Sequence, residues 1–191
     1  QAETSLQVSQ IAQLSGAFGV DFASTSSGLN VGGDLDADGD LSATMTAVAG
    51  IETGDADADA DLTDQVVGLN LDGDASTGSL AADVDGNADL SGSANLSFVA
   101  TAGSTTGDAA ADAEAEASVQ SVDVEDIDVA GTATISADTD LTANANASTT
   151  TEASNGADAN ATADTVEGLN IATDLSAGGD TTLSSDLDST L

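Results

Sequence analysis

The sequence predicts an all-β protein, an elongated antiparallel β-sandwich of long alternating strands around a small core rich in Ala and Gly. Two observations lead to this fold class. Over long stretches every second residue is apolar or Gly, which is the period of a strand with one dry face and one wet face. The apolar residues are also small: among 191 residues there are 3 Phe and 1 Met, no Trp and no Tyr.

The alternating stretches define the expected strands. They are residues 31–51, 80–102, 127–147 and, more loosely, 169–183, with shorter ones at 55–62, 108–119 and 157–163. An α-helix would scatter these apolar residues around its whole circumference, because its period is 3.6 residues. A stretch of about 20 residues makes a strand of roughly 65 Å. The alternatives are a β-solenoid or a cross-β stack, but solenoid corners normally interrupt the alternation, which favours the sandwich.

Internal repetition joins these stretches into one repetitive β domain over residues 23–191. Gly-Leu-Asn followed by an aliphatic residue occurs at 28–31, 68–71 and 168–171, with a degenerate copy at 124–129. Gly-containing turn signals precede the internal copies, at 53–55, 106–108 and 155–157. Because Gly and Asn tolerate positive φ, these signals indicate hairpin turns.

The N-terminal segment, residues 1–22, differs from the rest because no charged residue lies between Glu3 and Asp21. We expect Ser5–Phe22 to be a donor strand that completes the sheet of a neighbouring copy. The residues expected to contact the neighbour are Leu6, Val8, Leu14, Phe18, Val20 and Phe22. The alternative is that this segment is a core strand of its own subunit.

The charge of the chain excludes several partners. It has 35 Asp and Glu and no Lys, Arg or His, which gives a formal net charge of −35. Nucleic acid and anionic membranes are excluded as partners, since both are bound through Lys and Arg. No run of about 18 apolar residues exists, so we expect no membrane insertion. Dissolved cations must screen the self-repulsion, which suits a saline or calcium-rich milieu.

The sequence lacks most of the residue types that enzymes use for catalysis. General acid–base and nucleophilic sites rely on His, Lys, Tyr and Cys, all of which are absent. We therefore expect no enzyme, no catalytic residue and no cofactor apart from weakly bound Ca²⁺. The weak candidate ligands are Asp34, Asp36, Asp38 and Asp40, which resemble the start of an EF-hand loop. Loop position 12 is Met45 instead of Glu, so the same residues also fit an acidic strand face.

The sequence favours a structural function. We expect a secreted, non-catalytic subunit that self-assembles with copies of itself into an extracellular filament or matrix fibre, because edge-blocking Pro and Lys are absent. One alternative is an acidic Ca²⁺-binding matrix or surface-layer protein, and another is a spacer domain of an adhesin. The sequons at Asn95, Asn146 and Asn160 occur at about the frequency expected by chance.

Overall fold

The computed structural model describes residues 7–23, 29–72, 82–150, 156–172 and 174–191, and every element in these ranges is a β-strand. The strands are β1 Gln7–Ala23, β2 Leu29–Val31, β3 Leu35–Ile51, β4 Asp55–Asp72, β5 Ala82–Val84, β6 Ala88–Ser104, β7 Ala109–Val124, β8 Ile127–Val129, β9 Ala133–Thr149, β10 Ala157–Ile171, β11 Leu175–Ala177 and β12 Thr181–Thr190.

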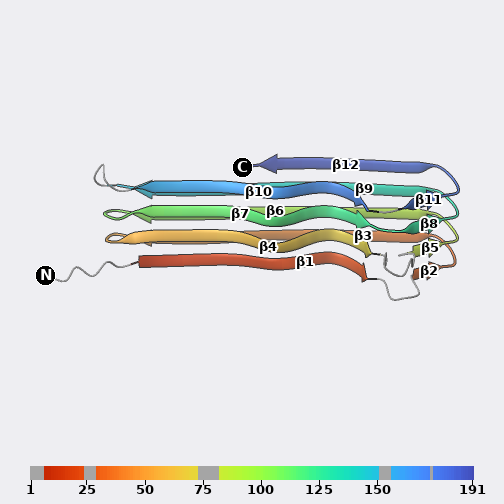
Figure 1. Cartoon of the computed structure of the whole chain (residues 1–191), viewed down its shortest axis with the longest axis horizontal. Helices are drawn as coiled ribbons and strands as arrows, with labels where there is room; N and C mark the ends of the chain where they lie inside the picture. Colours follow the sequence, from red (N-terminus) through yellow and green to blue (C-terminus); the bar gives the residue numbers. More distant parts are fainter. Residues whose placement is uncertain (1–6, 24–28, 73–81, 151–155, 173) are drawn as a thin grey trace.

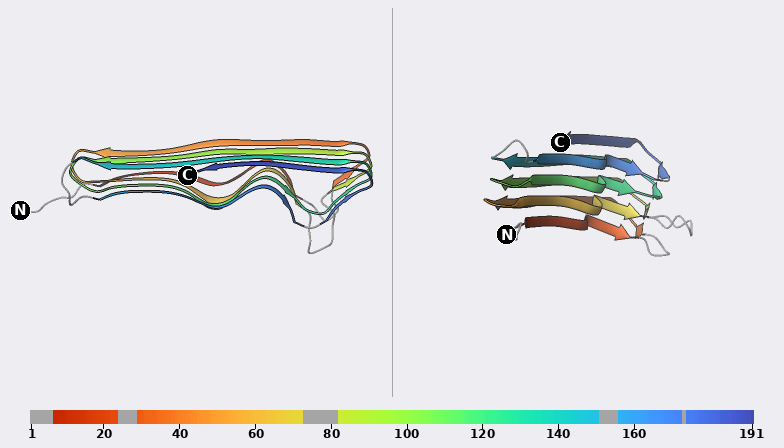
Figure 2. Two further views of the ribbon diagram at one scale, coloured as in Figure 1. Left: turned by 90° about the horizontal axis from the view of Figure 1, so that it is seen from above. Right: turned by 60° about the vertical axis from the view of Figure 1, so that its left-hand side comes forward.

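The strands form three parallel sheets of four strands each. Sheet A has the order β1-β4-β7-β10, sheet B the order β2-β5-β8-β11, and sheet C the order β3-β6-β9-β12. The chain thus adds one strand to each sheet in turn, and three successive strands make one coil. Figures 1 and 2 show four coils stacked into a flat slab, with the two long sheets face to face and the short sheet B at one end. This is the arrangement of a flattened β-solenoid.

The prediction of an antiparallel sandwich is therefore wrong, although the all-β character and the long strands are present. Alternation fixes which side chains lie on the dry face, but both strand directions place them equally well. The direction follows from the turns. Gly54, whose φ is 117°, lies in the corner that leads from β3 in sheet C to β4 in sheet A. The Gly-containing signals are thus corners between sheets and not hairpins within one sheet.

The core is a thin layer of small side chains between sheets A and C. One buried cluster contains Leu62, Leu96, Phe98 and Leu141 among many alanines. A second cluster, nearer to sheet B, contains Leu69, Leu71, Leu90, Ile127 and Ile135. Every buried side-chain nitrogen or oxygen in the described part of the chain has a hydrogen-bond partner.

A waist separates the two clusters, where sheet A bends towards sheet C (Figure 2). Gly39, Gly68 and Gly92 lie at this waist, and a Cβ at Gly68 would be 2.5 Å from the carbonyl oxygen of Ser93 and 2.6 Å from that of Ser121. These contacts are with backbone of both sheets, so only Gly fits. Strands at such a short separation leave no room for a layer of larger side chains.

The waist explains why a polar residue, Thr139, interrupts the alternation of residues 127–147. It is fully buried, and its hydroxyl donates to the Glu167 carbonyl oxygen of sheet A at 3.1 Å. The Ser121 hydroxyl lies 2.6 Å from the Thr139 hydroxyl and also bonds to the Asp138 carbonyl oxygen. The waist is therefore joined by hydroxyl groups instead of apolar contacts.

The three Gly-Leu-Asn copies do not all occupy equivalent positions. Leu69 and Leu169 both pair with Val122 in sheet A, whereas Leu29 belongs to sheet B and aligns through Ala82 with Ile127. The structural repeat is the coil, and equivalent residues in successive coils are between 45 and 53 positions apart. The degenerate copy at 124–129 spans the end of β7 and all of β8, so it too combines two sheets.

Candidate self-association surfaces

In the last coil, side chains that point towards the core are exposed to solvent. In the ladder that joins Ala37, Leu90, Ile135 and Leu183, the exposed fraction is 7%, 1%, 0% and 49%. Leu187 and Leu191 are 47% and 62% exposed, so three of the four large hydrophobic residues exposed in the described part of the chain lie in or directly after β12. Leu183 and Leu187 continue rows whose inner positions are buried, and no other strand of the described residues covers them.

Sheet A shows the same change at its last strand. Ala109 and Ala111 of β7 are buried, but their partners Ala157 and Ala159 in β10 are exposed. Strands β10, β11 and β12 are the outer strands of their sheets at this end, and β1, β2 and β3 are the outer strands at the other end. Outer strands offer backbone N–H and C=O groups to a further strand. We call these two ends the C-terminal end face and the N-terminal end face.

The residues predicted to contact a neighbour, apart from Leu6, lie in β1, and the backbone of β1 is part of the N-terminal end face. Leu14, Phe18 and Phe22 lie opposite Leu62, Val67 and Leu71 of β4 in the same chain. This pairing favours the alternative that the segment is a strand of its own subunit, and donation to a neighbour stays a prediction. Leu6 lies outside the described residues, as do the side chains of Val8, Leu14, Phe18, Val20 and Phe22.

Neutral donors from the next coil contact many carboxylates on the outer faces. In sheet C the Ser91 hydroxyl donates to Asp38 Oδ1 at 2.8 Å, and the Ser93 hydroxyl donates to Asp40 Oδ1 at 2.6 Å. In sheet A the Asn160 side-chain amide donates to Glu114 Oε1 at 2.7 Å. A chain without Lys or Arg thus uses Ser and Asn of one coil to bind acidic side chains of the coil before it.

The corners carry similar ladders. At the corner between sheets B and C, Asp34 Oδ1 accepts from the backbone N–H of Asn87 at 2.8 Å, and Asn87 Oδ1 accepts from the backbone N–H of Thr132 at 2.9 Å. At the opposite corner, Asp108 Oδ1 accepts from the backbone N–H of Gly156 at 2.7 Å. Each side chain therefore fixes the position of the following coil.

The four candidate calcium ligands do not converge. Asp34 lies at the corner, and Asp36, Asp38 and Asp40 follow at every second position along the outer face of β3, about 7 Å apart. Asp36 is opposite Asp89, while Asp38 and Asp40 bind serines. No group of three acidic side chains in the described residues is placed to hold a metal ion. Weak, diffuse Ca²⁺ binding stays a prediction.

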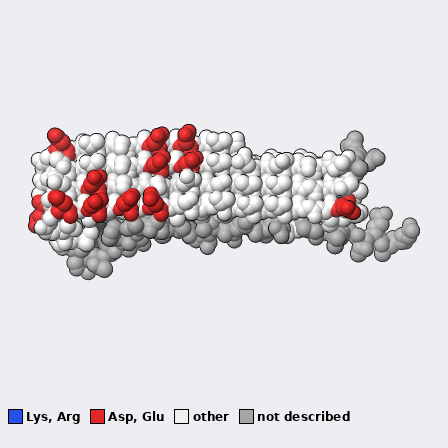
Figure 3. Space-filling view, turned by 180° about the vertical axis from the view of Figure 1, so that it is seen from behind, with Lys and Arg blue, Asp and Glu red and all other residues white. Residues whose placement is uncertain are grey.

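Acidic side chains gather over one half of the outer face of sheet C, and the other half of that face is almost free of charge (Figure 3). The acidic half comprises the first residues of each strand, including Asp36, Asp38, Asp40, Asp138 and Asp140. The opposite half carries Ser, Thr, Asn, Gly and Val. Sheet A runs in the opposite direction (Figure 1), so its acidic residues 55–61 lie at the other end of the long axis. Like charges are thereby spread over the slab.

Two acidic residues in sheet A remain poorly compensated. Asp59 and Asp61 lie opposite Asp112 and Glu114 of β7. Partial burial raises the pKa of Asp61 above its ordinary value, and the nearby charges, with Asp59 first, raise it further. The pKa of Asp59 is raised in the same way, by burial and then by Asp57. A raised folded-state pKa stabilises the fold at pH values below the unfolded-state pKa, and this contribution is lost as the pH rises through the folded-state pKa.

We therefore expect Asp61→Asn to stabilise the protein at pH 7, where repulsion between the carboxylates is present. The melting temperature should rise by roughly 1–3 °C, the size expected for removing one directly opposed like-charge pair. The gain should shrink at pH 4, because Asp61 is increasingly protonated there. Asp158→Asn is the matched control, since Asp158 of β10 is exposed and lies opposite Ala110 of β7. A lower melting temperature for Asp61→Asn at pH 7 would contradict this reading of the acidic ladder.

The three sequon asparagines, Asn95, Asn146 and Asn160, all lie on exposed positions of strands. The described part of the chain contains no helix long and apolar enough to cross a membrane. A surface hollow of about 160 Å³ is lined mainly by polar and acidic residues of β6, β9 and β12 and is open to solvent. Comparison with protein-family models, with characterised proteins and with solved structures finds no match for this chain. The arguments on function therefore rest on the end faces and on the surface chemistry.

Proposed function

We propose that this protein is a secreted, non-catalytic structural subunit that self-assembles end to end into an extracellular filament. The observation that carries the proposal is the open C-terminal end face, where Leu183 and Leu187 continue buried rows of the core but are about half exposed. Apolar rows exposed on a monomer indicate an association site. The N-terminal end face offers the outer strands of the same three sheets, so each outer strand of one copy can pair its backbone with the outer strand of the same sheet in another copy.

The charge of the chain supports this choice of surface. With 35 acidic and no basic residues, two copies repel each other over most of their surface and cannot form intermolecular salt bridges through side chains. Association must then use backbone ladders and apolar contacts, and the end faces supply both. Two faces that differ from each other give a head-to-tail contact, and repetition of such a contact produces a filament.

The test is the double variant Leu183→Ser with Leu187→Ser. Serine is tolerated here, because Ser185 and Ser189 already occupy the same face of β12. Losing about 2 kcal/mol of apolar burial at each contact should raise the concentration needed for assembly roughly 30-fold. Filament formation is measured by light scattering and electron microscopy. Val48→Ser is the matched control, since Val48 is 55% exposed but its side chain lies on the outer face of sheet C and belongs to none of the apolar rows that continue the core.

Two outcomes would contradict the proposal. If the wild-type protein stays monomeric over a wide range of concentration and salt, the filament function is wrong. If filaments form but dissolve completely when a calcium chelator is added, the acidic Ca²⁺-binding matrix protein becomes the better description. We expect filaments to persist in chelator, because the end faces need no bridging ion to pair their backbones.

A further inference from the structure

We infer that the copies in the filament stack in continued coil register, so that β12 of one copy lies beside β3 of the next, with β10 beside β1 and β11 beside β2. This inference rests on the proposed function and adds the partner strand for each edge and the residue-by-residue alignment. The resulting filament is one uninterrupted β-solenoid. It differs from strand donation, because each N-terminal strand keeps its place in its own chain.

Sheet C defines the alignment. The pairing of β3 with β6 and of β6 with β9 runs through all 17 residues without a register shift, and β9 pairs with all 10 residues of β12 without a shift. Asp38, Ser91, Ser136 and Ser184 therefore form one straight row across the four coils. The next coil in this row is the first coil of another copy, which places its Asp38 beside Ser184.

The polar residues at this junction match those inside the molecule. Ser184 meets Asp38 of the next copy, and Asp188 meets Ser42 of the next copy, in the same rows as above. Within the chain the equivalent contact of Ser91 with Asp38 is a hydrogen bond of 2.8 Å. The contact of Asp188 with Ser42 repeats the order found inside the chain, with the serine in the following coil, and the contact of Ser184 with Asp38 joins the same two groups in the reverse order.

The apolar rows continue as well. Leu187 meets Leu41 of the next copy, and Leu183 meets its Ala37. In sheet B, Leu175 meets Leu29 of the next copy. Leu29, Leu41 and Leu175 are all partly buried in the single chain and pack at the margins of its core. Stacking covers these side chains with residues of their own kind.

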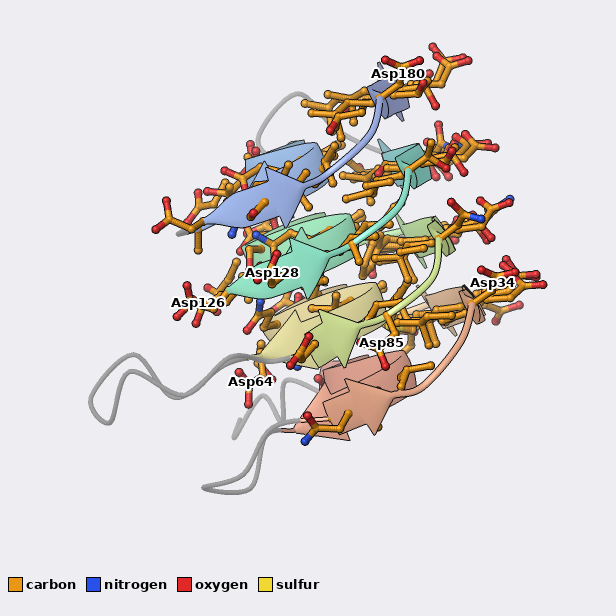
Figure 4. The ribbon with its side chains drawn as sticks, turned by 90° about the vertical axis from the view of Figure 1, so that its right-hand side faces the viewer. Asp34, Asp64, Asp85, Asp126, Asp128 and Asp180 are labelled. Carbon is orange, nitrogen blue, oxygen red and sulfur yellow. The ribbon has the colours of Figure 1, made fainter. Side chains whose placement is uncertain are left out.

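Two rows bring like charges together at the junction. Asp186 meets Asp40 of the next copy, and Asp180 meets its Asp34. Figure 4 shows Asp34 and Asp180 at the same corner, one at each end of the stack. Salt screens repulsion between exposed charges, so elongation in this register should become faster as the ionic strength rises.

The register is tested with the variant Asp38→Cys/Ser184→Cys, in a chain that has no cysteine of its own. Within one chain β3 and β12 are separated by β6 and β9, so the two cysteines are roughly 14 Å apart and cannot form a disulfide. Mild oxidation of assembled protein should therefore link copies to each other. We expect a ladder of covalent oligomers on a non-reducing gel, and only covalent dimers when the two single-cysteine variants are mixed.

The matched control is Asp36→Cys/Ser184→Cys, which loses the same charge but is displaced by two residues, about 7 Å along the strand. We expect at least a fivefold lower yield of linked oligomers from it. Equal or greater linking in the control, or filaments of the Asp38→Cys/Ser184→Cys variant that do not link, would overturn the register and leave the filament function standing. Failure of the wild-type protein to assemble would instead overturn the proposed function. Circular dichroism is used to check that each variant keeps its strands.

Discussion

Gly68→Val should lower the free energy of unfolding by about 3 kcal/mol or more, a large fraction of the total stability of an ordinary domain. The new Cβ would lie 2.5 Å from the Ser93 carbonyl oxygen, 2.6 Å from that of Ser121 and 2.8 Å from that of Gly39. All three atoms are backbone, so relief requires sheet A to move away from Ser93 and Gly39 of sheet C, and β4 to move away from Ser121 of β7. Separation breaks the hydroxyl contacts at the waist and loosens both core clusters.

Gly50→Val is the matched control, because a Cβ at Gly50 meets nothing within 4 Å. Valine is also a better strand residue than glycine, so the control should be neutral or slightly stabilising. Both variants are compared by urea unfolding followed by far-ultraviolet circular dichroism. Equal stability of the two would mean that the sheets do not approach each other at the waist as the structure has them.

Phe98→Ala should cost about 3–5 kcal/mol of unfolding free energy, the usual effect of truncating a fully buried aromatic side chain. Phe98 is the largest fully buried side chain of the described residues, and it lies opposite Met45 and Ala143 in a cluster otherwise made mainly of alanine and leucine. Alanine neighbours have no side-chain freedom with which to fill the cavity. The loss should therefore be near the upper end of this range.

Val99→Ala serves as the control, since Val99 is the next residue but points to the outer face of sheet C. Its effect should stay below about 1 kcal/mol, because Val99 is only partly buried and its side chain belongs to neither core cluster. Thermal unfolding measured by calorimetry gives both values. A loss for Phe98→Ala as small as that for Val99→Ala would contradict the placement of Phe98 in the core.

The sequence predicted the strands well because alternation is a local property. Ala56, Ala58 and Ala60 are buried while Asp57, Asp59 and Asp61 lie on the outer face, as the period of two requires. The direction of the strands could not be predicted in this way. An in-register parallel ladder and an antiparallel pair give the same dry and wet faces, and the choice depends on which sheet the chain enters after each corner.

The repeat was also misjudged for a physical reason. Three identical Gly-Leu-Asn tripeptides suggested three equivalent sites, but Gly68 lies at the waist while Leu29 lies in sheet B. The equivalent of Gly68 in the next coil is Ser121, which no tripeptide match detects. Backbone spacing, and not residue identity, decides which positions correspond between coils.

The sequence gives only part of the information needed to predict the end faces. The Leu residues of 183–187 share the parity of buried positions, but sequence alone does not show that the strand carrying them is the outermost one. The amino-acid sequence by itself determined the β character, the length of the strands and the division into an acidic face and a small apolar face, because these depend on neighbours along the chain. Only the tertiary structure decided the parallel coils, the glycine waist and the open end faces, because each depends on residues about 45 to 53 positions apart that meet only after the chain has turned through three sheets.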